Sequence, residues 1–120
     1  MATGTIQKDM VLLWENPNPS SSYSGGTIPL DLTSYDLICL AMSEYTTTST
    51  RKYYFFAKVG EVAPCAWAGS PNGFGVRRRL TTINSDSVVF DHGQVLIFGQ
   101  SAYQTEDTTT IPYRIYGLKE

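Results

Sequence analysis

Residues 35–45 read Tyr-Asp-Leu-Ile-Cys-Leu-Ala-Met-Ser-Glu-Tyr, and this stretch decides the fold class. Successive side chains of a β-strand point to opposite faces, so a strand here has two apolar faces. These faces are Leu37, Cys39 and Ala41, and Ile38, Leu40 and Met42. A strand of a two-layer antiparallel sandwich normally turns a polar face to water. We therefore expect a cover over the second face, either a loop or a neighbouring subunit.

Short runs of β-branched and aromatic residues recur on both sides of this stretch, each bounded by Gly, Pro, Asn, Asp or Ser. The pattern is typical of all-β proteins. We predict an antiparallel β-sandwich, jelly-roll-like, with about eight strands. It forms a single domain of residues 10–120 behind a flexible N-terminal arm of residues 1–9. The expected strands are Met10–Trp14, Thr27–Leu32, Tyr35–Tyr45, Arg51–Val59, Phe74–Ile83, Ser87–Phe90, Gln94–Gln100 and Ile111–Leu118.

Prolines and one polar triplet set limits on individual strands. Pro17 and Pro19 lack backbone donors and end the first strand. Pro29 can stand in a strand only where its missing N–H faces an edge of the sheet. Asp91-His92-Gly93 predicts a turn ahead of Gln94–Gln100, a run that is again apolar on both faces.

Composition excludes several classes of protein. The chain has 120 residues, 42% of them hydrophobic and 17% charged, with a formal net charge of −2. A nucleic-acid-binding protein normally carries a basic patch, and attachment to an anionic membrane also needs positive charge, so we expect neither. No apolar run approaches the roughly 20 residues that span a bilayer. The first residues lack the apolar segment of a signal peptide, which favours synthesis in a reducing cytoplasm.

Residues that could carry chemistry are few. Cys39 and Cys65 lie in apolar stretches and are predicted to be buried thiols, because two cysteines are too few for a zinc site or a disulfide scaffold. His92 is the one histidine, and no Gly-x-Ser-x-Gly motif accompanies it. Acidic residues on separate loops usually cap turns, although two of them could meet as a hydrolytic pair. We expect no catalytic residue, no metal and no cofactor.

The run Arg77-Arg78-Arg79 is the one concentration of charge. In a strand Arg78 points away from Arg77 and Arg79, so one side of the run enters the protein or a subunit interface. Arginine is preferred for buried ion pairs because its planar fork binds a carboxylate with two hydrogen bonds. A structural role is therefore favoured over binding of nucleic acid.

Aromatic residues are the remaining functional signal. Tyr23, Tyr45, Tyr53, Tyr54, Trp67, Phe74 and Tyr103 lie in or near expected loops. Flat rings beside polar groups suit binding of sugars. We predict a patch of Trp67, Asn72 and Phe74, since the turn Ser70-Pro71-Asn72-Gly73 places polar groups beside the indole. The alternative is that Trp67 plugs the end of the sandwich, because tryptophan is highly buried on average.

Both ends of the chain resemble a known pattern. Residues 12–20, Leu-Leu-Trp-Glu-Asn-Pro-Asn-Pro-Ser, resemble the opening of small β-rich domains in tail fibres and minor structural proteins of tailed bacteriophages. Residues 27–36 and 78–90 match the middle of that pattern more loosely. Residues 111–119, Ile-Pro-Tyr-Arg-Ile-Tyr-Gly-Leu-Lys, resemble its end.

The resemblance implies a non-enzymatic structural protein of the virion, of tail-fibre, tail-tip or decoration type, made in the host cytoplasm and exposed on the particle. Because tail fibres are commonly trimers, it also implies a homotrimer in contact with other virion proteins and with host-surface carbohydrate. The pattern often caps a fibre shaft, and this sequence shows no shaft. The alternative function is a carbohydrate-binding module for bacterial surface glycans, and a cell-wall hydrolase is a weaker one.

Overall fold

The computed structural model describes residues 10–44, 51–68, 75–97 and 108–119. Eight strands account for most of these residues, and no helix long and apolar enough to cross a membrane occurs in the described part of the chain. The strands are β1 (Met10–Glu15), β2 (Gly26–Pro29), β3 (Leu37–Glu44), β4 (Lys52–Ala57), β5 (Val62–Ala68), β6 (Gly75–Ile83), β7 (Ser87–Ile97) and β8 (Thr110–Leu118).

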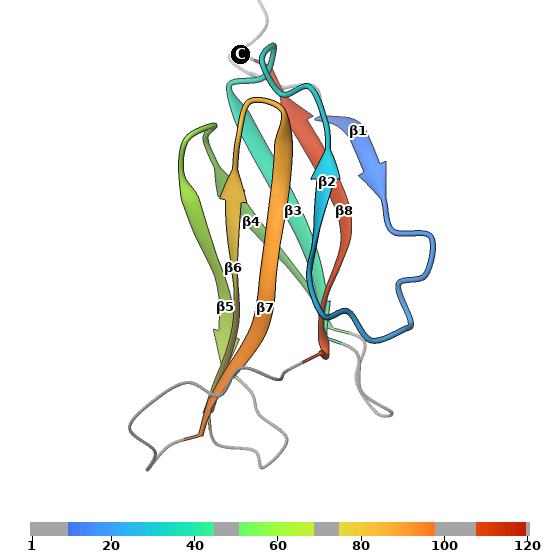
Figure 1. The fold of residues 1–120 in the computed structure, drawn as a ribbon, viewed down its shortest axis with the longest axis vertical. Helices are drawn as coiled ribbons and strands as arrows, with labels where there is room; N and C mark the ends of the chain where they lie inside the picture. Colours follow the sequence, from blue (N-terminus) through green and yellow to red (C-terminus); the bar gives the residue numbers. More distant parts are fainter. Residues whose placement is uncertain (1–9, 45–50, 69–74, 98–107, 120) are drawn as a thin grey trace, which may run out of the picture.

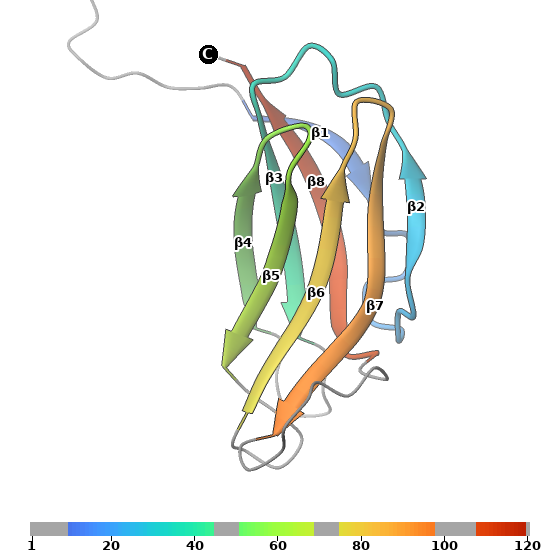
Figure 2. The same ribbon diagram turned by 60° about the vertical axis from the view of Figure 1, so that its left-hand side comes forward.

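The strands form two four-stranded antiparallel sheets. Sheet A has the order β1-β8-β3-β4, and sheet B has the order β2-β7-β6-β5. The sheets pack face to face, with β1 and β2 at one pair of edges and β4 and β5 at the other (Figures 1 and 2). This arrangement confirms the predicted antiparallel sandwich of about eight strands.

Strand position explains where proline is tolerated. Pro29 in β2 lies on an edge strand, as its missing N–H requires. Pro64 lies in β5, the opposite edge strand of sheet B, which the sequence analysis did not identify as a strand. Pro112 lies in the central strand β8, beyond the last pairing of that strand with β1, which joins Glu15 to Arg114. Pro29 and Pro64 thus lie on strands with one unpaired side, and at Pro112 the ladder with β1 has already ended.

The turn predicted at residues 91–93 is wrong, because β7 continues through it. The pairing of β6 with β7 shifts between Arg79 and Thr81, so that Asp91 and His92 together stand opposite Leu80. Two residues facing one form a β-bulge. The bulge exposes both polar side chains without ending the strand, which is why the local sequence resembled a turn.

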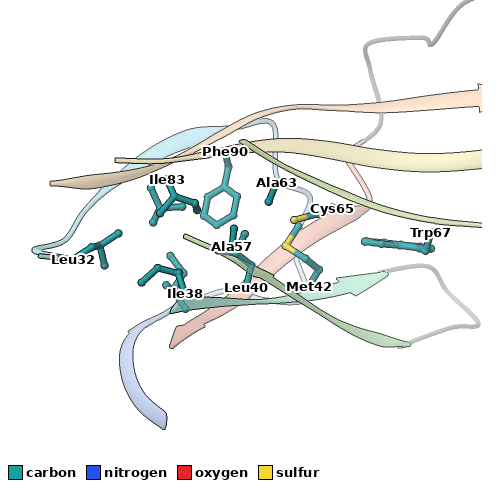
Figure 3. Close-up of a cluster of buried hydrophobic side chains, with 12 residues drawn as sticks. Leu32, Ile38, Leu40, Met42, Ala57, Ala63, Cys65, Trp67, Ile83 and Phe90 are labelled. Atoms are coloured by element: carbon teal, nitrogen blue, oxygen red, sulfur yellow. The ribbon is translucent and has the colours of Figure 1, made fainter. Parts of the chain in front are cut away.

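The core is a row of apolar side chains between the sheets (Figure 3). β3 contributes Ile38, Leu40 and Met42, and Phe90 of β7 reaches in from the other sheet. The fully or largely buried side chains of this cluster are Leu32, Ile38, Leu40, Met42, Ala57, Ala63, Cys65, Trp67, Ile83, Val88, Phe90 and Ile115. Figure 3 shows Leu32 at one end of the row and Trp67 at the other.

The outer face of β3 is covered within a single chain. Cys39 pairs with Phe56 and Tyr116 on its two neighbours, and Ala41 pairs with Tyr54 and Arg114. Cys39 and Ala41 are fully buried, since small side chains between large ones are shielded on both sides. The second apolar face therefore does not by itself require a neighbouring subunit.

Candidate ligand-binding face

The predicted patch around Trp67 is not an exposed platform. The Trp67 side chain is 7% exposed, and its ring stacks on Tyr53 with the centroids 4.4 Å apart and the planes 10° from parallel. Phe55 lies at 6.1 Å from the same indole. Trp67 thus closes one end of the core, which was the alternative considered for it. Asn72 and Phe74, the other members of the patch, lie outside the described residues.

A different group of aromatic and charged side chains meets on the outer face of sheet A. They surround an open pocket of about 650 Å³, here called the outer-face pocket. It lies where the segment after β1 passes beside β8 and β4. Its lining residues are Glu15, Asn16, Pro17, Pro19, Lys52, Tyr54, Tyr113 and Arg114.

A bulge in β8 brings two adjacent side chains to this face. Ala41 of β3 pairs with Arg114 and Met42 pairs with Pro112, so Tyr113 is an extra residue between the two pairs. A strand without a bulge would send Tyr113 and Arg114 to opposite faces. With the bulge, both line the pocket. Strict alternation along Ile111–Leu118 would place Tyr113 on the side of Ile115, and the bulge places it on the side of Arg114 instead.

Asn16 fixes the segment that forms the pocket wall. Its side chain is buried, its Nδ2 donates to the Pro112 carbonyl at 2.9 Å, and its backbone N donates to the Tyr113 carbonyl at 2.9 Å. Its Oδ1 accepts a hydrogen bond from the Asn18 backbone N at 2.8 Å. One side chain thus turns the chain after β1 and attaches the turn to the bulge. Pro17 follows Asn16 and Pro19 follows Asn18, and the fixed φ of these two prolines stiffens the turn further.

Two cationic groups flank the ring of Tyr113. The Lys52 ammonium lies 4.5 Å from the ring centroid, and the Arg114 guanidinium carbon lies 5.8 Å from it. The Tyr113 hydroxyl donates to the Tyr54 hydroxyl at 2.8 Å. Burial of the ring, together with this hydrogen bond, raises the pKa of Tyr113. The phenol therefore stays protonated and acts as a hydrogen-bond donor within the pocket.

Arg114 is held at the rim by two partners. Its Nε donates to Glu15 Oε2 at 2.6 Å, and its Nη1 donates to the Tyr116 hydroxyl at 3.1 Å. The hydrogen bond to Tyr116 and the one to Glu15 raise the pKa of Arg114, which is always protonated in any case. These two hydrogen bonds fix the guanidinium group of Arg114 between Glu15 of β1 and Tyr116 of β8.

The described lining residues of the outer-face pocket include no pair of facing acids. Glu15 is the only carboxylate among the described lining residues, and it is paired with Arg114, whereas glycoside hydrolysis uses two facing acids. The described residues contain no group of three or more potential metal ligands. Asp31 accepts hydrogen bonds from the backbone and hydroxyl of Thr33, which lower its pKa, as expected of an acid that caps a turn.

The arginine run has the expected alternation. Arg77 and Arg79 are buried, and Arg78 bonds Gln94 Oε1 at 2.7 Å on the other face. Arg77 lies 3.8 Å from the carboxylate of Glu44 and donates to the Thr109 hydroxyl. Arg79 donates to backbone carbonyls of three separate segments. Cys39 and Cys65 are free thiols and buried, as predicted.

Tyr113 was absent from the predicted binding residues, and Tyr54 was considered only as one loop aromatic among several. One local signal was available: in residues 52–57 the ring of Tyr54 alternates with those of Tyr53 and Phe55, so one face had to be exposed. The approach of Asn16 to Pro112, 96 residues later, had no such signal. Comparisons with family models, curated proteins and solved structures gave no match.

Proposed function

We propose that the chain is a non-enzymatic structural protein on the exterior of a bacteriophage virion, of tail-fibre, tail-tip or decoration type. The observation that supports this proposal is the meeting of the two end motifs. The opening motif contains Asn16, and the closing motif contains Pro112 and Tyr113, to which Asn16 is hydrogen-bonded. The residues that carry the phage resemblance are therefore the residues that join the segment after β1 to strand β8.

The surface is compatible with an extracellular particle. Charged residues make up only 17% of the chain, and both cysteines are buried, which leaves few exposed reactive groups among the described residues. Self-association, with a trimer as the expected state, belongs to the same proposal. Exposed apolar side chains on the edge strand β1 and around the β4–β5 turn are the available contact surface; they are Met10, Val11, Leu12, Phe56, Val59 and Val62.

A second candidate function is recognition of bacterial surface glycans by a carbohydrate-binding module. The outer-face pocket favours it, because the exposed ring of Tyr54 and the half-buried ring of Tyr113 stand there beside an arginine, a lysine and a carboxylate. Such mixed aromatic and polar surfaces are usual in ligand sites. The two functions are compatible in a receptor-binding tip.

Peptide mass spectrometry of gradient-purified phage particles tests the virion proposal. The particles come from a host strain that carries the gene in a prophage, and a variant prophage without the gene serves as the control. Peptides of this chain at a stoichiometry comparable to known tail components would support it. Their absence from particles, with the protein abundant in the lysate, would refute it.

A further inference from the structure

We propose that the outer-face pocket binds an anionic saccharide, a sugar unit whose substituent is a carboxylate or a phosphate. This inference rests on the second candidate function and adds the chemical class of the ligand. Three features of the pocket support it: the hydrogen bonds of the tyrosines, the charges at the rim and the exposed rings of β4.

Two tyrosine hydroxyls on this face accept hydrogen bonds from neighbouring side chains. Tyr54 accepts the hydrogen bond of Tyr113, so its own hydroxyl hydrogen remains available to a ligand. Tyr116 accepts from Arg114 in the same way and keeps its hydrogen. Each of the two hydrogen-bonded pairs, Tyr113 with Tyr54 and Arg114 with Tyr116, therefore keeps one tyrosine hydroxyl hydrogen that can be donated. A ligand rich in acceptor oxygens complements such a surface.

The charges point to the same class of ligand. Lys52 and Arg114 bring two positive charges to the pocket, and Glu15 offsets one of them. Within the part of the chain that the structure describes, the Lys52 ammonium makes one long hydrogen bond, of 3.4 Å, to the Ser43 hydroxyl, and an ammonium group has three donors. The pocket therefore has a positive balance although the whole chain carries −2. Guanidinium and ammonium groups bind carboxylate and phosphate through charge-assisted hydrogen bonds.

Exposed aromatic side chains continue from the pocket along β4. Tyr54 and Phe56 are 54% and 55% exposed, and they point to the same side because they are two residues apart. Strand geometry separates such neighbours by about 6.6 Å. Their ring faces offer a surface for the apolar face of a pyranose, while the pocket holds its charged substituent.

Binding of defined probes by the full-length protein tests the proposal. Isothermal titration calorimetry compares an oligogalacturonate, which carries carboxylates, a glycerol-phosphate-substituted glucan, and neutral maltohexaose. At least one anionic probe is expected to bind at least about tenfold more tightly than maltohexaose, and more weakly in high salt. The first two probes distinguish carboxylate from phosphate as the preferred group.

Two pocket variants and one matched control locate the site. Lys52→Gln and Tyr54→Ala should each weaken binding of the anionic probe about tenfold or more, whereas Lys58→Gln, another exposed lysine beyond the end of β4, should leave it unchanged. Circular dichroism melting checks that each variant is folded. An unchanged affinity of folded Lys52→Gln and Tyr54→Ala would overturn the assignment to this pocket.

The titrations give different results if the anionic preference is wrong and if the carbohydrate-binding function itself is wrong. Equal binding of maltohexaose would overturn the anionic preference but keep a carbohydrate-binding module. No binding of any probe up to about 1 mM would overturn both the inference and the module. Neither result bears on the mass spectrometry of the particles, which tests the virion role separately.

Discussion

Asn16 links the segment after β1 to strand β8 through one buried amide. The amide hydrogens and oxygen have separate partners, the Pro112 carbonyl and the Asn18 backbone N. Aspartate, the side chain of the same shape, offers only acceptors when ionised and has no donor for the Pro112 carbonyl. The residue is therefore needed for the wall of the outer-face pocket as well as for the stability of sheet A.

Replacing Asn16 by Ala should lower the free energy of unfolding by about 1–3 kcal/mol, because it leaves a buried carbonyl and a turn amide without partners. Asn18→Ala is the control, since Asn18 is exposed and two positions away, and its effect should stay within about 0.5 kcal/mol. Urea denaturation followed by tryptophan fluorescence measures both. Equal stability of the two variants would contradict the role given to Asn16.

Arg79 connects the two sheets from within. Its Nε donates to the Thr110 carbonyl in sheet A at 2.9 Å, its Nη1 to the Asp91 carbonyl at 2.5 Å and its Nη2 to the Tyr23 carbonyl at 2.6 Å. The guanidinium fork reaches three segments at once, which an ammonium point charge does not. A buried arginine at this position is thus a structural cross-link.

Arg79→Lys should therefore cost about 2–4 kcal/mol of unfolding free energy, since two or more buried carbonyls lose their donors. Arg78→Lys, one residue away on the other face, is half-buried in the wild type and should cost less than about 1 kcal/mol. Thermal and urea unfolding of both proteins distinguish them. If Arg78→Lys lowers the free energy of unfolding as much as Arg79→Lys does, burial of the Arg79 guanidinium is not the cause of the effect.

The buried cysteines predict a loss of stability at high pH. Burial raises the pKa of both thiols to about 11, from an ordinary value of 9.0. Because the folded state resists ionisation that the unfolded chain permits, stability is unaffected below the ordinary value and falls as the pH rises toward the folded value. Urea unfolding across that range should show a steeper decline in the wild type than in the Cys39→Ala/Cys65→Ala protein. Equal slopes would contradict it.

Strand β8 is the element on which sheet A depends. It pairs with β1 on one side and β3 on the other, and it buries Ile111, Ile115 and Leu118. Each of these side chains contributes about 1.5–3 kcal/mol when buried. Together they are comparable to the stability of a whole small domain.

A chain that ends at Thr110 is expected to be unfolded or insoluble, whereas removal of Lys119 and Glu120 alone should leave the melting temperature nearly unchanged, since Lys119 is exposed. Expression and circular dichroism of the two truncated proteins provide the measurement. A soluble product ending at Thr110 that melted like the full chain would show that β8 is dispensable.

The local sequence pattern identified most strands, but it missed β5 and divided β7 into two. β5 was not recognised because Pro64 and three alanines hide its alternation, and only its edge position makes Pro64 acceptable. β7 was divided in two because a bulge gives adjacent polar residues the look of a turn. In both strands the deciding fact is a partner strand, which local sequence does not contain.

The fold as a whole brings segments that are far apart in the sequence to one place. The outer-face pocket combines the segment after β1 with β4 and the bulge of β8, so its residues are separated by up to about a hundred positions. Sequence patterns predicted that aromatic side chains would be exposed beside polar ones, and that holds for Tyr54. Which aromatics meet depended on strand order and on a one-residue bulge, and neither is encoded in local alternation.

Immunogold electron microscopy of intact phage particles tests the central claim, that this sandwich is displayed on the virion exterior. Antibodies raised against the folded protein are applied to gradient-purified particles, with particles lacking the gene as the control. The account predicts gold at a fixed position on the outside of intact particles and none on the control. Gold that binds only after the particles are disrupted, or that never exceeds the control, would contradict it.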